Sequence, residues 1–364
     1  MRRTTLFALT IGLLAAVIVT PIALSAKKDG VAVAKAYVAA HSKPPASIGK
    51  LPAVSKTPAT GKRVDWLECG VPVCKLIGKG IAAATKALGW KLKVIPMGTT
   101  PEEIGRAWTT AVEDNPDAVL ATGVPQALFK RQLAQLKAKG IPYVAGSTTD
   151  PNTNGQIANV PSQADYRLRG SMMANFVVAD TNGAAKAVMF NIPDFPVLVI
   201  EQKAFAATLK KLCPSCSLDI VNVSATDIGG KLPGRVVSYI QQKPDTNYMV
   251  AAFGDMTLGV PQALKAAGLD SNLRIISQAS GPNNFQNIKN GLVEYAAVPE
   301  PDAMAGWRMI DVLVRSFNGD PLACCNLGTL PRHYLTKSNI GNPAQPYVGV
   351  PGYPNEFLKL WKVK

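Results

Sequence analysis

The sequence contains very few residues that could act as a catalytic base or a metal ligand. Among its 364 residues there are two histidines, His41 and His333, and they are not at the spacing of a zinc finger. The chain has no Gly-x-Ser-x-Gly nucleophile motif and no phosphate-binding loop that ends in Lys-Ser or Lys-Thr. We therefore expect a protein that is not an enzyme and that carries no metal and no cofactor.

A dense basic run is also missing, although the formal net charge is +15. The lysines and arginines are spread along the chain, which is typical of solvated faces rather than of a nucleic-acid interface. We expect no nucleic-acid partner. The length and a hydrophobic content of 47% leave room for two domains of ordinary size.

The only long apolar run lies at the start of the chain, over residues 6–24. Two arginines precede it and small residues follow it, which predicts a secretory signal peptide over residues 1–26 and an exported protein of the periplasm or the outer cell envelope. A retained membrane anchor is the alternative, because about 19 apolar residues would just span a bilayer. No cysteine follows the run directly, so lipid attachment is not expected.

The six cysteines fall into three close pairs: Cys69 with Cys74, Cys213 with Cys216, and Cys324 with Cys325. In an oxidising compartment such pairs favour local disulfides, which we predict for the first two. An adjacent pair would close a strained ring, so the partner of Cys324 and Cys325 is left open. The second pair has redox-motif spacing, but it follows a predicted helix and lacks the thiolate stabilisation of a helix start.

Residues 27–62 are rich in Ala, Lys, Pro and Ser and predict a linker. From Arg63 onward, short apolar strands alternate with amphipathic helices, one of which has Thr100 as its cap and Pro101 in its first turn. Strands of this kind are typical of parallel sheets that are covered on both faces. The predicted fold is α/β, with two doubly wound, Rossmann-like lobes.

Gly78, Gly80 and Ala83 match a dinucleotide-binding fingerprint by spacing alone. They lie inside the first predicted helix rather than in the turn before it, so their amides could not reach a phosphate. We expect no dinucleotide site.

Ligands of open parallel sheets bind at the carboxyl ends of the strands, so a cleft between two lobes would be lined by residues that end or follow strands. The candidate ligand-binding residues are Trp66, Glu68, Val71, Val73, Ser147, Thr148, Thr149, Phe195, Val197, Phe253, Asp255, Gln278, Ser280, Glu300 and Asp302. Convergence of Glu68, Asp255 and Asp302 could also support acid–base chemistry, which leaves an extracellular hydrolase as an alternative.

Several segments follow the order found in one known family. They are Gly70 to Trp90, Lys139 to Tyr143, Phe253 to Met256 and Pro299 to Asp302. Over roughly residues 63–340 the chain resembles the ribose-binding-like type I periplasmic binding proteins, the sugar-type substrate-binding proteins of ABC transporters.

The resemblance implies three crossovers between the lobes, near Asn159, Pro299 and Leu330. It implies an N-terminal lobe of residues 63–158 plus 281–299, a C-terminal lobe of 159–280 plus 300–330, and a closing strand and tail over 331–364. It further implies a monomer that captures a small molecule and docks to an ABC transporter permease. A ligand sensor that reports to a membrane receptor is the alternative. A cytoplasmic repressor of related fold is excluded by the export signal and by the absence of a DNA-binding helix pair before Arg63.

The chain departs from the family at the ligand positions. Val73 and Cys74 replace two stacking aromatics, and Ser147 to Thr149 replace an Asp that grips hydroxyls. Asp255 is the one charged contact retained, and the family's cleft Arg has no clear counterpart. Because a buried polar group without a partner costs about 1 to 3 kcal/mol, a typical sugar fits poorly. We expect a more apolar cleft, walled by Val71, Val73, Phe195, Val197 and Phe253, for a sugar or a less polar solute.

Overall fold

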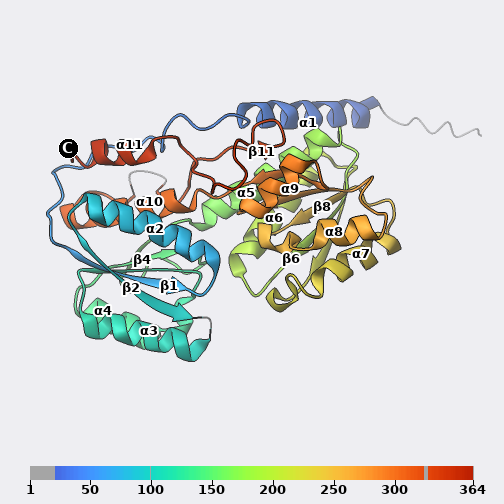
Figure 1. The fold of residues 1–364 in the computed structure, drawn as a ribbon. Helices are drawn as coiled ribbons and strands as arrows, with labels where there is room; N and C mark the ends of the chain where they lie inside the picture. The colour runs from blue at the N-terminus through green and yellow to red at the C-terminus, as the bar shows by residue number, and fades with distance from the viewer. Residues whose placement is uncertain (1–20, 99, 324–326, 364) are drawn as a thin grey trace, which may run out of the picture.

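The computed structural model describes residues 21–98, 100–323 and 327–363, and it confirms the predicted two-lobed α/β fold (Figure 1). The first lobe is built on a five-stranded parallel sheet of order β2-β1-β3-β4-β5. Its strands are β1 (Arg63–Cys69), β2 (Lys91–Gly98), β3 (Ala118–Thr122), β4 (Tyr143–Gly146) and β5 (Gln156–Asn159). Its helices are α2 (Pro72–Ala87), α3 (Pro101–Asp114), α4 (Lys130–Ala138), α10 (Asp302–Asn318) and α11 (Tyr353–Leu360), with the short helix η1 (Gln126–Leu128).

The second lobe is built on a six-stranded sheet of order β11-β10-β9-β8-β6-β7, in which only the β10–β11 pair is antiparallel. Its strands are β6 (Lys186–Asn191), β7 (Ser217–Asn222), β8 (Tyr248–Ala251), β9 (Arg274–Gln278), β10 (Glu294–Val298) and β11 (Leu335–Thr336). Its helices are α1 (Pro21–Ala40), α5 (Gln163–Asp180), α6 (Pro196–Leu212), α7 (Leu232–Gln242), α8 (Val260–Ala266) and α9 (Pro282–Asn290), with η2 (Ala225–Asp227) and η3 (Gly254–Thr257).

Local sequence signals explain the helix starts. Thr100 caps α3 by accepting a hydrogen bond from the Glu103 amide, Glu103 accepts one from the Thr100 amide, and Pro101 occupies the first turn. Gly78 and Gly80 lie inside α2, as expected. A Cβ on Gly80 would lie 1.9 Å from the Ala303 carbonyl oxygen, so the glycine allows α2 to pack closely on α10.

The division of the chain between the lobes differs from the expected one. Strand β10 pairs with β9 and helix α9 packs beside it, so residues 281–299 belong to the second lobe. Helix α10 packs on α2 and its side chains join the first lobe's core, so the segment from residue 302 belongs to the first lobe. The prediction that residues 281–299 belong to the first lobe and that the segment after them belongs to the second lobe is wrong. Their sequences do not indicate which sheet they join, because both read as ordinary strand and helix.

The structure also corrects the prediction that residues 27–62 form a linker. Part of it belongs to helix α1, whose Val31, Ala34 and Val38 pack against the core of the second lobe. The following segment crosses to the first lobe, where Ile48 and Val54 are buried. In Figure 1 this N-terminal part runs along the same side of the molecule as the C-terminal segment that leads from β11 to α11. The chain therefore crosses between the lobes at both of its ends as well as at the three expected places.

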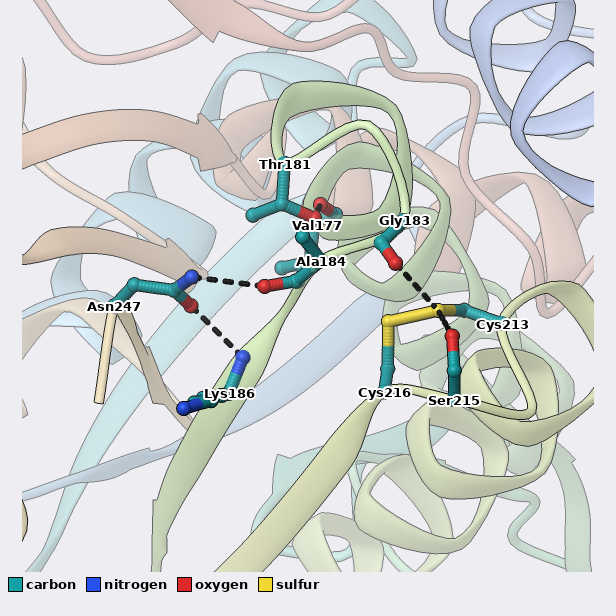
Figure 2. Close-up of a disulfide and its surroundings, with 9 residues drawn as sticks. All are labelled: Val177, Thr181, Gly183, Ala184, Lys186, Cys213, Ser215, Cys216 and Asn247. Carbon is teal, nitrogen blue, oxygen red and sulfur yellow. Dashed lines mark hydrogen bonds between the residues drawn. A yellow bond between two sulfur atoms is a disulfide. The ribbon is translucent and has the colours of Figure 1, made fainter. Parts of the chain in front are cut away.

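The two predicted disulfides are present. Cys69 pairs with Cys74 between β1 and α2, with Cα atoms 5.7 Å apart. Cys213 pairs with Cys216 in the turn between α6 and β7, with Cα atoms 5.3 Å apart (Figure 2). Both Cα separations are usual for a disulfide. Cys324 and Cys325 lie outside the described residues.

The predicted signal peptide lies mostly outside the described part of the chain, which begins at Pro21. Within the described residues, no helix combines the length and the apolar character that crossing a membrane requires.

Candidate functional site

Three crossovers join the carboxyl ends of the two sheets. The first leads from β5 to α5, where Ser162 caps the helix by accepting from the Ala164 amide. The second leads from β10 to α10 through Glu300, and the third leads from the end of α10 to β11 through Leu330. These positions agree with those that the resemblance implies. In such a fold the carboxyl ends of the strands are the expected ligand-binding edge.

A network of buried charges fills this junction, and we call Asp165, Arg169, Gln278, Glu300 and Arg332 the hinge cluster. Arg169 donates from Nε to the Asp165 carboxylate at 2.7 Å and from Nη1 to the Gln278 Oε1 at 2.7 Å, and it lies 2.7 Å from a Glu300 oxygen. Arg332 donates from Nη2 to both Asp165 oxygens at 2.6 Å. Through these bonds the cluster connects α5 and the end of β9, in the second lobe, to the second and third crossovers.

The electrostatics of the hinge cluster follow from its pairing. Burial alone would raise the pKa of Asp165, but Arg332, Arg169 and the Leu330 amide hold that pKa below its usual value. Burial alone would lower the pKa of Arg169, but Glu300 and Asp165 hold it well above its usual value. Each of these two charges is thus stabilised by its neighbours in the folded protein.

Two further carboxyl groups near the cluster are destabilised as anions. Burial raises the pKa of Glu201 on α6 well above its usual value, and neither of its carboxyl oxygens has a hydrogen-bond partner among the described residues. Burial and the Glu300 carboxylate together raise the pKa of Asp302. The Asp255 carboxylate, in η3 of the second lobe, adds to that rise.

The first-lobe loop after β4 is held by hydrogen bonds from the end of β5 and the start of α5. Ser147 adopts a left-handed backbone conformation with φ of 54°. Thr148 accepts from the Asn159 amide group through its carbonyl at 2.7 Å and its hydroxyl at 3.0 Å. The Thr149 carbonyl accepts from Gln163 at 3.0 Å. Thr148 is buried, which leaves Ser147 and Thr149 as the partly accessible members of the loop.

The loop between β1 and α2 carries the other first-lobe candidates. Val71 is 45% exposed, while Glu68 and Val73 are half-buried. The Cys69–Cys74 disulfide closes this loop. Trp66 is fully buried in the first lobe's core, so the structure does not place it in the cleft as expected. Its position on a central strand between β2 and β3 turns its ring toward α2, where it lies against Gly78.

The second lobe contributes an apolar pair and a carboxylate. Phe195 is 41% exposed and lies edge-on to Phe253, with ring centroids 6.5 Å apart. Val197 is buried behind them in the lobe's core. Asp255 is exposed, yet desolvation by the surrounding loop raises the pKa of its carboxyl group.

A hollow of about 330 Å³ opens beside Asp255 between η3 and α9, and we call it the amide hollow. Its side chains are unusually rich in carboxamides: Gln262, Asn283, Asn284, Gln286 and Asn287 line it together with Asp255, Thr257 and Leu258. Asn284 and Asn287 donate to the buried Glu294 carboxylate at 2.9 Å. These bonds fix the wall of the hollow, whereas Asp255, Gln262 and Asn283 stand at its accessible side.

The remaining candidates have partners within the protein. Gln278 donates to the Ala252 carbonyl at 2.6 Å as well as accepting from Arg169, and Glu300 pairs with Arg169. Ser280 lies 2.7 Å from Ser277, hydroxyl to hydroxyl. The candidates therefore separate into buried residues, some of which hold the hinge and some of which, such as Trp66 and Val197, belong to the lobe cores, and residues that face solvent at the strand ends.

Sequence reasoning missed Asp165, Arg169, Arg332 and Glu201. The one available signal was the spacing of Asp165 and Arg169, four residues apart on a predicted helix. Such pairs usually lie on solvated faces, so the spacing alone does not distinguish a buried cluster from a surface ion pair.

Comparison with known proteins gives the fold and the family. A family model described as "Periplasmic binding protein domain" matches residues 70–321. GanP, a glucose-galactose binding protein from Geobacillus stearothermophilus, has a similar structure with a TM-score of 0.67 at 18% identity, covering 77% of this chain and 99% of that one. A periplasmic ribose ABC transporter protein from Conexibacter woesei has a TM-score of 0.68 at 14% identity, covering 79% of this chain and 95% of that one.

A third similar structure is the XylFII-LytSN complex, with a TM-score of 0.64 at 17% identity, covering 78% of this chain and all of the matched chain. No curated protein matches this chain in sequence. The family model covers more than half of the chain, and the family consists of extracytoplasmic proteins that bind substrates rather than convert them. The two parallel sheets, the three crossovers and the family match together show that this chain belongs to the periplasmic binding protein domain family, with the type I fold.

Proposed function

We propose that the protein is an extracytoplasmic solute-binding protein that captures a small molecule between its lobes and delivers it to an ABC-type importer, without catalysing a reaction. The observation that carries the proposal is the joining of two parallel sheets at their carboxyl ends by three crossovers. This arrangement allows lobes to close around a ligand at the strand ends. We further propose that the predicted signal segment exports the chain and that the protein acts as a monomer.

The proposed ligand contacts are the accessible residues at the strand ends. Asp255 would accept hydrogen bonds from ligand hydroxyls, and the carboxamides of the amide hollow beside it would add donors and acceptors. Ser147 would contribute from the first lobe. Phe195 and Phe253 would form an apolar wall. This set suits a compact solute with a few hydroxyls and one apolar face, either a sugar or a less hydroxylated molecule.

The proposal is tested by a thermal-shift screen of the full chain against sugars, polyols, nucleosides, aromatic acids and steroids. A ligand at 100 times its dissociation constant should add about 2.7 kcal/mol of stability. The matched pair of variants is Asp255→Asn and Asp270→Asn, since both aspartates are exposed on the second lobe and only Asp255 is a candidate. A tenfold weaker affinity would reduce the gain to about 1.4 kcal/mol. A shift reduced to about half in D255N but unchanged in D270N supports the site, and equal shifts in both contradict it.

Delivery is tested separately by uptake of the identified solute into cells that lack the gene. Restoration of uptake by the wild-type chain, but not by D255N, supports import. The XylFII-LytSN complex shows a protein of similar fold bound to a partner protein, which favours partner signalling as the second candidate. Solute binding in vitro together with unchanged uptake in the deletion strain would favour that candidate.

A further inference from the structure

A second cavity, of about 470 Å³, lies away from the proposed ligand residues, and we call it the hinge pocket. Four parts of the chain enclose it: the segment after α1, helix α5, the start of α10 and the third crossover. None of the candidate ligand-binding residues lines it. It therefore needs its own explanation.

Arg308 on α10 is the first unusual feature of the hinge pocket. Its side chain is buried, and its guanidinium donates to the Ile48 carbonyl at 2.6 Å and, more weakly, to the Leu327 carbonyl at 3.4 Å. Its Nε has no hydrogen-bond partner among the described residues. No carboxylate of the described chain lies within ion-pair distance of this guanidinium, whereas Arg315 on the same helix pairs with Asp311 at 2.9 Å.

The guanidinium of Arg308 is nonetheless charged at neutral pH. Burial lowers the pKa of Arg308 to about 10, which is still well above 7. A buried cation without a paired anion is costly, because the protein has removed its water and has supplied two carbonyl oxygens and the Phe357 ring, 5.6 Å away, in return. An anion in the pocket would relieve that cost.

Arg332 adds a second unsatisfied donor. Its Nη2 is engaged by Asp165, but its Nη1 is buried and has no partner in the described part of the chain. Lys50 also lines the pocket, and the lining contains neither Asp nor Glu. The polar side of the hinge pocket thus carries two cations without an ion pair among the described residues, Arg308 and Lys50, and one free donor on the paired Arg332.

The rest of the lining is apolar, with Ile48, Leu51, Leu168, Met172 and Leu330 as its main members. An inorganic ion alone would leave this surface uncovered, and a neutral apolar molecule would leave the guanidinium donors unpaired. Guanidinium groups form their strongest hydrogen bonds with carboxylate and phosphate oxygens.

We propose that the hinge pocket binds a small amphipathic anion, with a carboxylate or phosphate monoester held by Arg308 and Arg332 and a short aliphatic chain against the leucines. Ile48 and Arg308 belong to the first lobe's packing, while Leu168 and Met172 lie on a second-lobe helix. An occupant of the pocket therefore contacts both lobes at the hinge, independently of the solute in the cleft.

The test is isothermal titration of the full chain with hexanoate, hexyl phosphate, hexanol and inorganic phosphate. The expected result is binding of at least one of the two amphipathic anions, with hexanol and inorganic phosphate each at least about tenfold weaker, as the loss of a charge-assisted hydrogen bond or of the chain's burial predicts. No binding of either amphipathic anion at millimolar concentration would overturn the proposal, as would equal binding of hexanol.

Two variants locate the site. Arg308→Met removes the cation and should weaken binding of the amphipathic anion at least about tenfold, whereas Arg106→Met, on the exposed face of α3, should not change it. Leu168→Trp fills the pocket and keeps both arginines, so it should abolish binding even if R308M fails to fold. Unchanged affinity in L168W would overturn the assignment of the site.

Discussion

The hinge cluster and the loop that carries Asp255 both contain acidic side chains at strand ends, but these side chains differ in burial and in ion pairing. Glu300 in the hinge cluster is buried and paired with Arg169 at 2.7 Å. Asp255 is exposed and has no ion-pair partner among the described residues. A buried pair fixes the relative position of the elements that carry it, whereas an accessible carboxylate is available to a ligand. The comparison separates residues that hold the lobes together from residues that face the solute.

The largest expected effect comes from breaking the hinge cluster. Arg169→Met leaves Asp165 and Glu300 without their shared guanidinium, and removing one partner from a buried ion pair costs about 3 to 5 kcal/mol. We expect a loss of that size in the free energy of unfolding, measured by urea denaturation. Arg167→Met, on the exposed side of the same helix, is the control and should unfold like the wild type. A near-neutral R169M would show that the cluster does not hold the hinge.

The next effect concerns the disulfide at the first-lobe edge of the site. Replacing both Cys69 and Cys74 by Ser opens a loop with a sequence separation of 5. A loop this short predicts a loss of about 2 kcal/mol in the free energy of unfolding. Denaturation of the double variant checks the value. A stability unchanged by the double replacement would show that the loop is held by its packing alone.

The carboxylate of Asp255 should matter for binding and not for folding. D255N should weaken the affinity for the solute by about tenfold, or 1.4 kcal/mol, because one ligand hydrogen bond to a charged group is lost. It should cause no loss of stability against unfolding, since the side chain has no ion-pair partner to lose and burial already raises its pKa. Calorimetric titration and denaturation of the same sample check both parts. A large loss of stability in D255N would remove the distinction between the two regions.

The smallest expected effect is a gain in stability from Glu201→Gln. Because burial raises the pKa of Glu201 in the folded protein, folding takes up protons at any pH where the unfolded chain has released more of them than the folded chain. This cost is absent below the unfolded pKa, near 4, and grows as the pH rises above it. We expect E201Q to be more stable than the wild type by about 1 kcal/mol or more at pH 7, with the difference disappearing toward pH 4. A pH-independent difference would mean that folding does not shift the pKa of Glu201.

Much of the fold could be predicted from the sequence because its signals are local. The alternation of strands and helices from Arg63 onward is found, and the cap and first-turn proline of α3 act as their residue types predict. Crossover positions near Asn159, Pro299 and Leu330 followed from the family resemblance. The lobe membership of α9, β10 and α10 could not be predicted, because it depends on which sheet edge accepts a strand.

The candidate site could be predicted only in outline. Residues at strand ends were found because the topology places them there, and Asp255 and Phe195 are accessible as expected. Gln278 and Glu300 end or follow strands too, yet they are directed toward Arg169. Trp66 lies within β1 and is buried in the core. The sequence indicates which residues lie at the carboxyl edge of a sheet. The direction of each side chain depends on the packing of helices that are distant in the sequence.

Small-angle X-ray scattering of the full chain shows whether a solute binds between the lobes and draws them together. The solute from the thermal-shift screen is added to the wild type and to D255N at the same concentration. If the solute draws the lobes together, the radius of gyration of the wild type should become smaller when solute is added, and that of D255N should change less. A radius that stays constant while calorimetry shows saturating binding would contradict closure of the lobes.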